Sequence, residues 1–160
     1  MAVAHRTFFF YLLIILFSFL INNSAQSQSK HSFQYLGKNL GQQLSVIEAM
    51  EDQNKALNII TVLCEDERLS TLEKLSALAS KGRVLHKLGQ LENAIKVAQQ
   101  EQQLANEFEL TRIEADAYKR VGVYAYYNGK NRLALLSYQQ ALNYYLTLDE
   151  PIAQANLYNN

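Results

Sequence analysis

Three small residues recur along the chain at a fixed spacing of 40 residues, and this repeat limits the possible fold more than any other feature. The small residues are Gly82, Gly89 and Ala94 in one unit, and Gly122, Gly129 and Ala134 in the next. A period of this length is typical of arrays in which one supersecondary unit stacks on the next. The repeat therefore predicts a chain of similar units rather than a single closed core.

The order of the small residues within a unit predicts two helices and a turn. A glycine inside a helix costs about 1 kcal/mol relative to alanine, so the first glycine is expected where a second helix passes too close for a β-carbon. The second glycine stands where a helix ends and a left-handed cap is favoured. The alanine is expected to mark the close contact from the second helix. Each unit should therefore be a helical hairpin that buries its apolar face by stacking.

The apolar residues between these positions follow helical spacing. Ranges 72–88 and 91–104 carry leucine-rich stripes of this kind, and the next unit repeats the arrangement. Its two stripes are Ile113, Tyr118, Val121, Tyr124 and Ala125, followed by Leu133, Ala134, Tyr138, Ala141, Leu142 and Tyr145. These patterns favour an all-α fold.

The residues of the second unit resemble the tetratricopeptide repeat (TPR). The matching positions are Tyr118, Val121, Gly122, Gly129, Ala134, Tyr138 and Ala141. The preceding unit matches at Leu78, Gly82, Gly89, Ala94 and Ala98, but has Lys81 and Glu101 at positions that are usually apolar or small. The period is 40 rather than the usual period of about 34. The resemblance implies a right-handed α-solenoid of stacked helical hairpins over residues 71–160.

The residues on either side of the two clear units also fit an array. Residues 33–70 are expected to hold a divergent hairpin, because terminal repeats are often atypical. Its apolar stripes would be Leu36, Leu40, Leu44 and Ile47, then Ala56, Leu57, Ile60 and Leu63. Pro151 is suited to the first turn of a further helix. The sequence reaches Asn160 before the next glycine of the repeat, so we expect a truncated unit in a longer protein.

The amino-terminal segment has the layout of a secretory signal. Residues 8–21 are apolar except for Ser18, and His5 and Arg6 precede them. A membrane-spanning helix needs about 20 apolar residues, so we predict a signal peptide over residues 1–25, cleaved after Ala25. Residues 26–32 would follow as a polar linker. An uncleaved signal anchor and a buried core helix are the alternatives.

The composition excludes several classes of function. Fifteen basic residues balance 15 acidic ones, which argues against a nucleic-acid-binding protein with a broad basic face. The chain has one cysteine, Cys64, and its histidines, His5, His31 and His86, form no metal-binding pattern. No phosphate-binding loop or catalytic motif is present. We expect no metal, cofactor or catalytic site in these 160 residues.

The resemblance to the TPR family implies a ligand-binding surface on the first helix of each hairpin, which lines the concave side of such arrays. The corresponding residues are Arg83, His86, Lys87, Asp116, Lys119, Val123, Tyr126, Tyr127, Asn156 and Asn159. TPR proteins that clamp a peptide carboxylate place an asparagine one turn after a basic residue. Here Val123 follows Lys119 at that place, which argues against this mode of binding.

These features together suggest an exported scaffold that binds a protein, a peptide or another ligand. The layout resembles the periplasmic sensor region of bacterial histidine kinases and diguanylate cyclases, in which a membrane helix and an output domain follow. The alternative is a stand-alone periplasmic or secreted adaptor. A weaker alternative is TPR decoration of a peptidase or transferase. A homodimer formed through the repeats is compatible with each.

Overall fold

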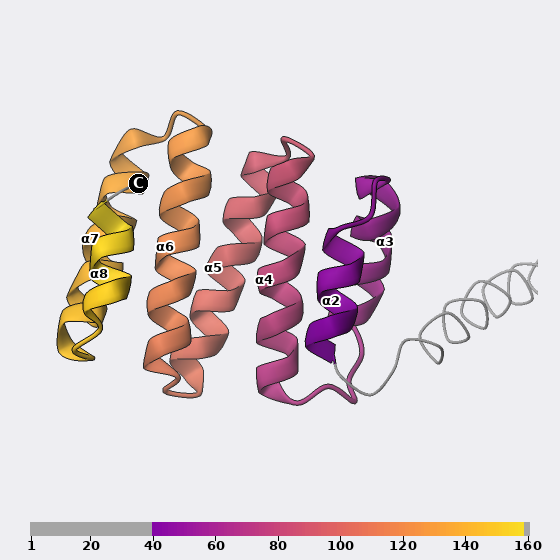
Figure 1. The fold of residues 1–160 in the computed structure, drawn as a ribbon, viewed down its shortest axis with the longest axis horizontal. Helices are drawn as coiled ribbons and strands as arrows, with labels where there is room; N and C mark the ends of the chain where they lie inside the picture. Colours follow the sequence, from indigo (N-terminus) through magenta and orange to yellow (C-terminus); the bar gives the residue numbers. More distant parts are fainter. Residues whose placement is uncertain (1–39, 159–160) are drawn as a thin grey trace, which may run out of the picture. The chain divides into compact units, whose positions relative to one another are not determined.

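Four consecutive helices of equal length carry the small-residue repeat. They are α4 (Thr71–Lys87), α5 (Leu91–Glu107), α6 (Thr111–Tyr127) and α7 (Asn131–Thr147), and each has 17 residues. Figure 1 shows them side by side in chain order, and each contacts the next. Short turns join them, so the units alternate helix and turn as the glycine and alanine spacing predicts.

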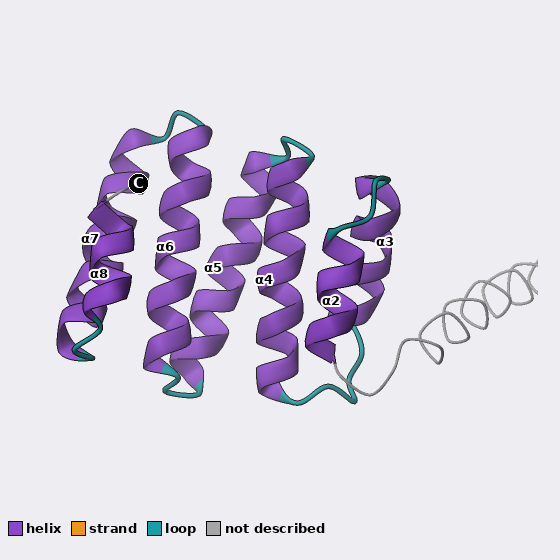
Figure 2. Ribbon diagram, viewed as in Figure 1, coloured by secondary structure: helices purple, strands orange, loops and turns teal. Residues whose placement is uncertain are grey.

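The computed structural model describes residues 40–158, and these are helical with no strand among them (Figure 2). Before α4 stand α2 (Leu40–Glu48) and α3 (Gln53–Cys64), and after α7 stands α8 (Pro151–Tyr158). The all-α prediction is therefore confirmed for this part of the chain. The predicted signal peptide, its cleavage site, the polar linker and Asn159 lie outside the described residues.

The turns between the long helices repeat one geometry at intervals of 20 residues. The backbone is left-handed at Gly89, Glu109, Gly129 and Asp149, with φ values of 70°, 55°, 73° and 53°. In each turn the amide that follows donates to a carbonyl five residues earlier, as from Lys130 to Ala125 at 2.8 Å. These bonds satisfy carbonyls that the helix end leaves open. The predicted caps at both glycines are confirmed, and the intervening turns use acidic residues in the same conformation.

Replacing Glu109 by glycine is expected to raise the free energy of unfolding by about 1 kcal/mol, because left-handed backbone costs an ordinary L-residue about 1–2 kcal/mol. Asp149→Gly should stabilise less, since aspartate tolerates this conformation better. Gly89→Ala is the opposite control, and a β-carbon there would meet no atom within 4 Å. Urea unfolding followed by circular dichroism measures all three. Equal stability of Gly89→Ala and wild type would contradict this account.

The first long helix has a defined start that the divergent segment before it leads into. Ser70 caps α4, accepting a hydrogen bond from the Glu73 amide, while the Glu73 carboxylate accepts one from the Ser70 amide at 2.9 Å. This reciprocal arrangement satisfies two amides that a helix start leaves open. In the preceding segment, α2 contacts α3, and both contact α4.

The core runs through the helix pairs as connected clusters. One cluster draws on α4 to α7 and the other on α6 to α8, with Tyr145 fully buried in the second. The buried members of the first are Leu85, Ala94, Ile95, Val97, Ala98, Val121, Tyr124, Ala125 and Ala134. Those of the second are Ala115, Ala141, Tyr145, Ala153 and Leu157. Each pair of helices therefore completes its core with the next pair.

The two glycines inside helices face aromatic rings rather than the repeat alanines. A β-carbon on Gly122 would lie 2.6 Å from the ring of Tyr138, on α7. A β-carbon on Gly82 would lie 3.2 Å from the hydroxyl oxygen of Tyr124, on α6. The close approach at both glycines is confirmed, but its partner is a tyrosine side chain. The gap that each glycine leaves is filled by a ring, which buries more apolar surface than an alanine methyl group.

Candidate functional site

Three rings gather at the carboxyl ends of α4 and α6, and we call the group His86, Tyr126 and Tyr127 the aromatic surface. The His86 ring lies 5.0 Å from the Tyr127 ring, and the Tyr126 and Tyr127 rings lie 5.7 Å apart in an edge-to-face arrangement. Tyr126 and Tyr127 are 56% and 63% exposed. Two neighbouring first helices thus present large rings to solvent at one place.

A buried tyrosine lies beneath this surface. Tyr124 stacks on His86 with ring centroids 5.3 Å apart, and it is 3% exposed. Its hydroxyl makes no hydrogen bond to any residue that the structure describes. Burial raises the pKa of Tyr124 to about 12. Tyr124 therefore holds His86 in place by packing while it stays neutral at ordinary pH.

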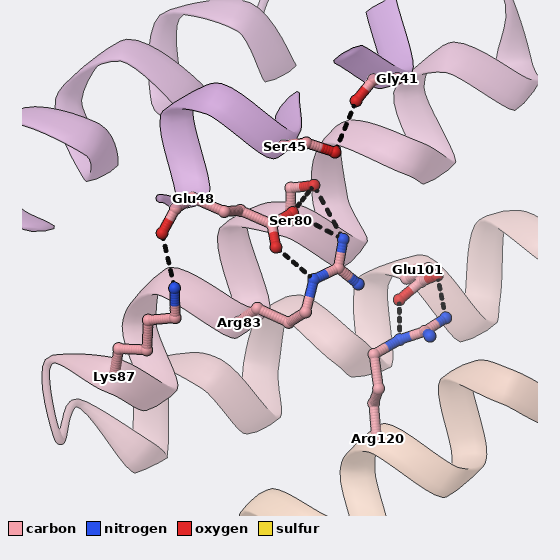
Figure 3. Close-up of polar contacts among 8 residues, drawn as sticks. All are labelled: Gly41, Ser45, Glu48, Ser80, Arg83, Lys87, Glu101 and Arg120. Carbon is pink, nitrogen blue, oxygen red and sulfur yellow. Dashed lines mark hydrogen bonds and ion pairs between the residues drawn. The ribbon is translucent and has the colours of Figure 1, made fainter. Parts of the chain in front are cut away.

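Two of the predicted basic ligands are held by a carboxylate of the same chain (Figure 3). Arg83 donates from Nε and Nη2 to the Glu48 carboxylate at 2.9 and 2.7 Å. The Lys87 ammonium donates to the Glu48 carbonyl, and the Ser80 hydroxyl donates to the Glu48 carboxylate. Burial opposes ionisation of Glu48, but the hydrogen bonds from Arg83 and Ser80 prevail and lower its pKa.

This arrangement changes the role expected for the basic residues. A bidentate arginine–carboxylate contact fixes the guanidinium geometrically. Glu48 lies at the end of α2, and its partners lie on α4, so the contact joins the divergent hairpin to the first clear repeat. Arg83 and Lys87 therefore act first as internal contacts, and any acidic ligand has to compete with Glu48.

A second carboxylate–arginine pair lies deeper, between α5 and α6 (Figure 3). Arg120 Nε donates to Glu101 at 2.9 Å, and its Nη2 also contacts the Glu101 carboxylate. The Glu101 side chain is 1% exposed. Burial raises the pKa of Glu101, against the opposing charge of Arg120. Glu101 takes the register of Ala141 in the next unit, so the departure from the TPR pattern here is a buried ion pair.

The remaining predicted residues of the first helices have different environments. Asp116 accepts hydrogen bonds from the Tyr145 hydroxyl and from Arg112, each at 2.6 Å, so it too is engaged internally. Lys119 and Val123 are half-buried, and Val123 packs against the first core cluster. Asn156 is exposed on α8. Of the predicted set, the structure brings together the ring residues, while Asp116 contributes to a separate network.

The residues expected to define the repeat lie mainly in the interior. Tyr118 is half-buried and stacks on Tyr144 with centroids 5.9 Å apart, and Tyr138 is half-buried against Gly122. Ala141 is fully buried. The two left-handed glycines are exposed at the turns. These residues build the scaffold and offer no binding chemistry of their own.

Two important residues carried no signal in the sequence. Glu48 belongs to no repeat motif, and its role depends on α2 lying against α4. Tyr124 is three residues before Tyr127 on the same helix, yet one is buried and the other exposed. Helical spacing separates two faces of α6, and only the position of α4 decides which face is covered.

The described residues offer little for metal, redox or membrane chemistry. No group of three or more His, Cys, Asp or Glu side chains within residues 40–158 is arranged to hold a metal ion. Cys64 is half-buried and unpaired, and burial raises the pKa of its thiol. None of the helices in this part of the chain is long and apolar enough to cross a membrane.

The chemistry available at the aromatic surface is therefore stacking and hydrogen bonding. Exposed tyrosines offer an apolar ring face and a hydroxyl at one site, which is why tyrosine is enriched where proteins bind one another. Comparison with protein-family models finds no match to the chain, and comparison with curated proteins finds none either.

Proposed function

We propose that the chain is an exported TPR-like scaffold that binds a protein or peptide segment at the aromatic surface. The carrying observation is the exposure of Tyr126 and Tyr127 together on α6, in contact with His86 of α4. Such a scaffold would be a right-handed solenoid whose first helices line the binding face. The equal helices, with left-handed turns at intervals of 20 residues, support this architecture.

The contacts around the surface favour a ligand recognised through its side chains. Arg83, Lys87 and Asp116 already have partners within the chain, so few unpaired charges are available there. Lys119 lies three turns before the end of α6 and makes no ion pair within residues 40–158. The ligand class that fits is a peptide segment with aromatic, proline or aliphatic side chains that stack on tyrosine.

Site-specific photocrosslinking tests this proposal in the native host cells. A benzophenone amino acid replaces Tyr126 in the full chain, and the matched control places it at Gln99, an exposed residue of α5. We expect a discrete adduct with another polypeptide from position 126 and none from 99. Tyr127→Ala in the first chain should abolish the adduct. No adduct, or the same adduct at both positions, would refute binding at the aromatic surface.

The leading form of this function is the amino-terminal sensor region of a bacterial membrane signalling protein, such as a histidine kinase or diguanylate cyclase. A stand-alone periplasmic or secreted adaptor is the alternative. Both require export, which the apolar run at residues 8–21 with Arg6 before it supports. Membrane fractionation of the natural full-length product distinguishes them, since only the sensor is expected to remain with membranes after a high-salt wash.

Export itself is tested with a reporter enzyme that is active only outside the cytoplasm, fused after Asn160. We expect activity from the natural sequence and its loss when Leu12 and Leu13 are both replaced by aspartate, because two charges destroy the apolar run. Equal activity of both fusions would show that this run does not direct export.

A further inference from the structure

The outer face of α7 is unusually apolar for an exposed surface. Leu135, Leu136 and Leu146 are 59%, 50% and 55% exposed, and Leu142 is half-buried. All four lie within one stripe of the helix, because their spacing follows the helical repeat. This stripe, defined as Leu135, Leu136, Leu142 and Leu146, is called the leucine stripe.

The repeat itself provides a control for this face. The residues of α5 at the register of Leu136 and Leu146 are Lys96 and Asn106, and both are exposed. The α5 helix is followed by another helix pair, α6 and α7, which leaves these two positions uncovered. Continuing the array after α7 would therefore not be expected to cover Leu136 or Leu146. The fold tolerates polar residues at these positions, so their apolar character calls for a partner.

The spacing along α7 suits a helix packed against it lengthwise. Leu135, Gln139, Leu142 and Leu146 follow one another at intervals of four, three and four residues, the spacing of a coiled-coil seam. Three of these four positions are leucine. A single helix of a partner, lying nearly parallel to the α7 axis, would contact all of them.

The charges at the two ends of the stripe are opposite. Arg132 stands in the first turn of α7, and Asp149 stands just after its last turn. Both are exposed, and neither forms an ion pair within residues 40–158. An antiparallel copy of the same helix would therefore present its acidic end to the basic end of the first.

From the leucine stripe and these end charges, we propose that α7 is the interface with a second copy of this chain, packed antiparallel about a twofold axis. One register satisfies every pair at once: Leu135 with Leu146 of the second copy, Gln139 with Leu142, and Arg132 with Asp149. Because the axis is twofold, each pair occurs twice, as in other isologous interfaces. The interface uses a face of α7 that the proposed ligand site on α4 and α6 does not use, so the two proposals stand or fall separately.

Disulfide trapping tests the register in the full chain. In a Cys64→Ser background, Leu135→Cys and Leu146→Cys together should give a covalent dimer on mild oxidation. Either cysteine alone should not, because in the antiparallel register like residues lie about 16 Å apart along the helix, beyond the Cα separation of about 7 Å that a disulfide allows. Efficient crosslinking by a single variant, or none by the double variant, would overturn the antiparallel register.

Register-matched substitutions test the interface by a second route. Leu136→Lys with Leu146→Asn gives α7 the residues that α5 carries at the same positions, so folding should be preserved. Light scattering should show a dimer for the full-length wild type and a monomer for this variant, with equal helical circular dichroism. A wild-type chain that is monomeric at every concentration, or a variant that remains dimeric, would refute the proposal.

Charge reversal distinguishes a second copy from a different partner. Arg132→Glu, which installs the residue type of Glu92 at the same register of α5, should weaken the dimer. Asp149→Lys should weaken it also, and combining the two should restore the dissociation constant to within about tenfold of wild type. Failure of the combined variant to recover any affinity would argue against Arg132 contacting Asp149 of another copy.

Discussion

Arg120→Met is expected to lower the free energy of unfolding by about 3–5 kcal/mol at pH 7, because it leaves the buried Glu101 carboxylate without its partner. The Glu101 side chain is 1% exposed, so water cannot replace the guanidinium without local opening. Chemical denaturation at constant temperature measures the loss. A difference under about 0.5 kcal/mol, the usual range for surface substitutions, would show that the pair is not buried.

The same loss should depend on pH in a defined direction. Burial raises the pKa of Glu101 above 4.5, so the folded chain binds this proton more tightly than the unfolded chain. The contribution of Glu101 to stability therefore falls as the pH rises through its folded pKa. Arg120→Met removes an opposing charge and raises this pKa further. The penalty should be smaller at pH 5 than at pH 7, and a constant penalty would contradict a charged Glu101.

A double variant separates the ion pair from the packing. Replacing Glu101 and Arg120 both by methionine removes the buried charge and keeps a similar volume. Because well-packed apolar replacements of buried ion pairs are often neutral or stabilising, the double variant should recover most of the stability that Arg120→Met loses. No recovery would mean that Arg120 matters mainly through contacts other than Glu101.

Gly122→Ala is expected to destabilise the fold by about 1–2 kcal/mol, although alanine favours a helix by about 1 kcal/mol over glycine. The new β-carbon would lie 2.6 Å from the Tyr138 ring, and that ring is packed at its root as well as its edge. Thermal and urea unfolding both measure this change. Gly82→Ala should cost less, since its closest atom is the Tyr124 hydroxyl oxygen at 3.2 Å.

The control for Gly122 changes the sign of the effect. In a Tyr138→Ala background the ring is gone, so Gly122→Ala should now stabilise by up to about 1 kcal/mol through helix propensity. The two backgrounds form a double-mutant cycle in which residues in contact show coupling. The same destabilisation in both backgrounds would mean that Tyr138 does not occupy the space beside Gly122.

The positions of helix ends could be predicted where glycine marked them and not elsewhere. Gly89 and Gly129 have a conformational preference that the sequence displays directly. Glu109 has no such preference, so its left-handed turn follows from the helices on either side and gave no local signal. The 40-residue repeat visible in the sequence is therefore half as fine as the 20-residue spacing of the turns.

The candidate site was predictable in position but not in detail. Resemblance to the TPR family indicated the first helices, and the aromatic surface lies there. The internal contacts of Arg83 with Glu48, and of Arg120 with Glu101, join residues that are 35 and 19 positions apart. Such pairs depend on how whole helices pack, which spacing within one helix does not reveal. Sequence reasoning therefore overestimated how many charged residues are available to a ligand.

Backbone φ angles at residues 89, 109, 129 and 149, obtained from chemical shifts and three-bond couplings in solution, test most directly that one helix-and-turn unit repeats through this chain. The account predicts positive φ at all four positions, with uninterrupted helix between them. A helix that continues through Glu109 or Asp149, or extended backbone in any of the intervening segments, would contradict it.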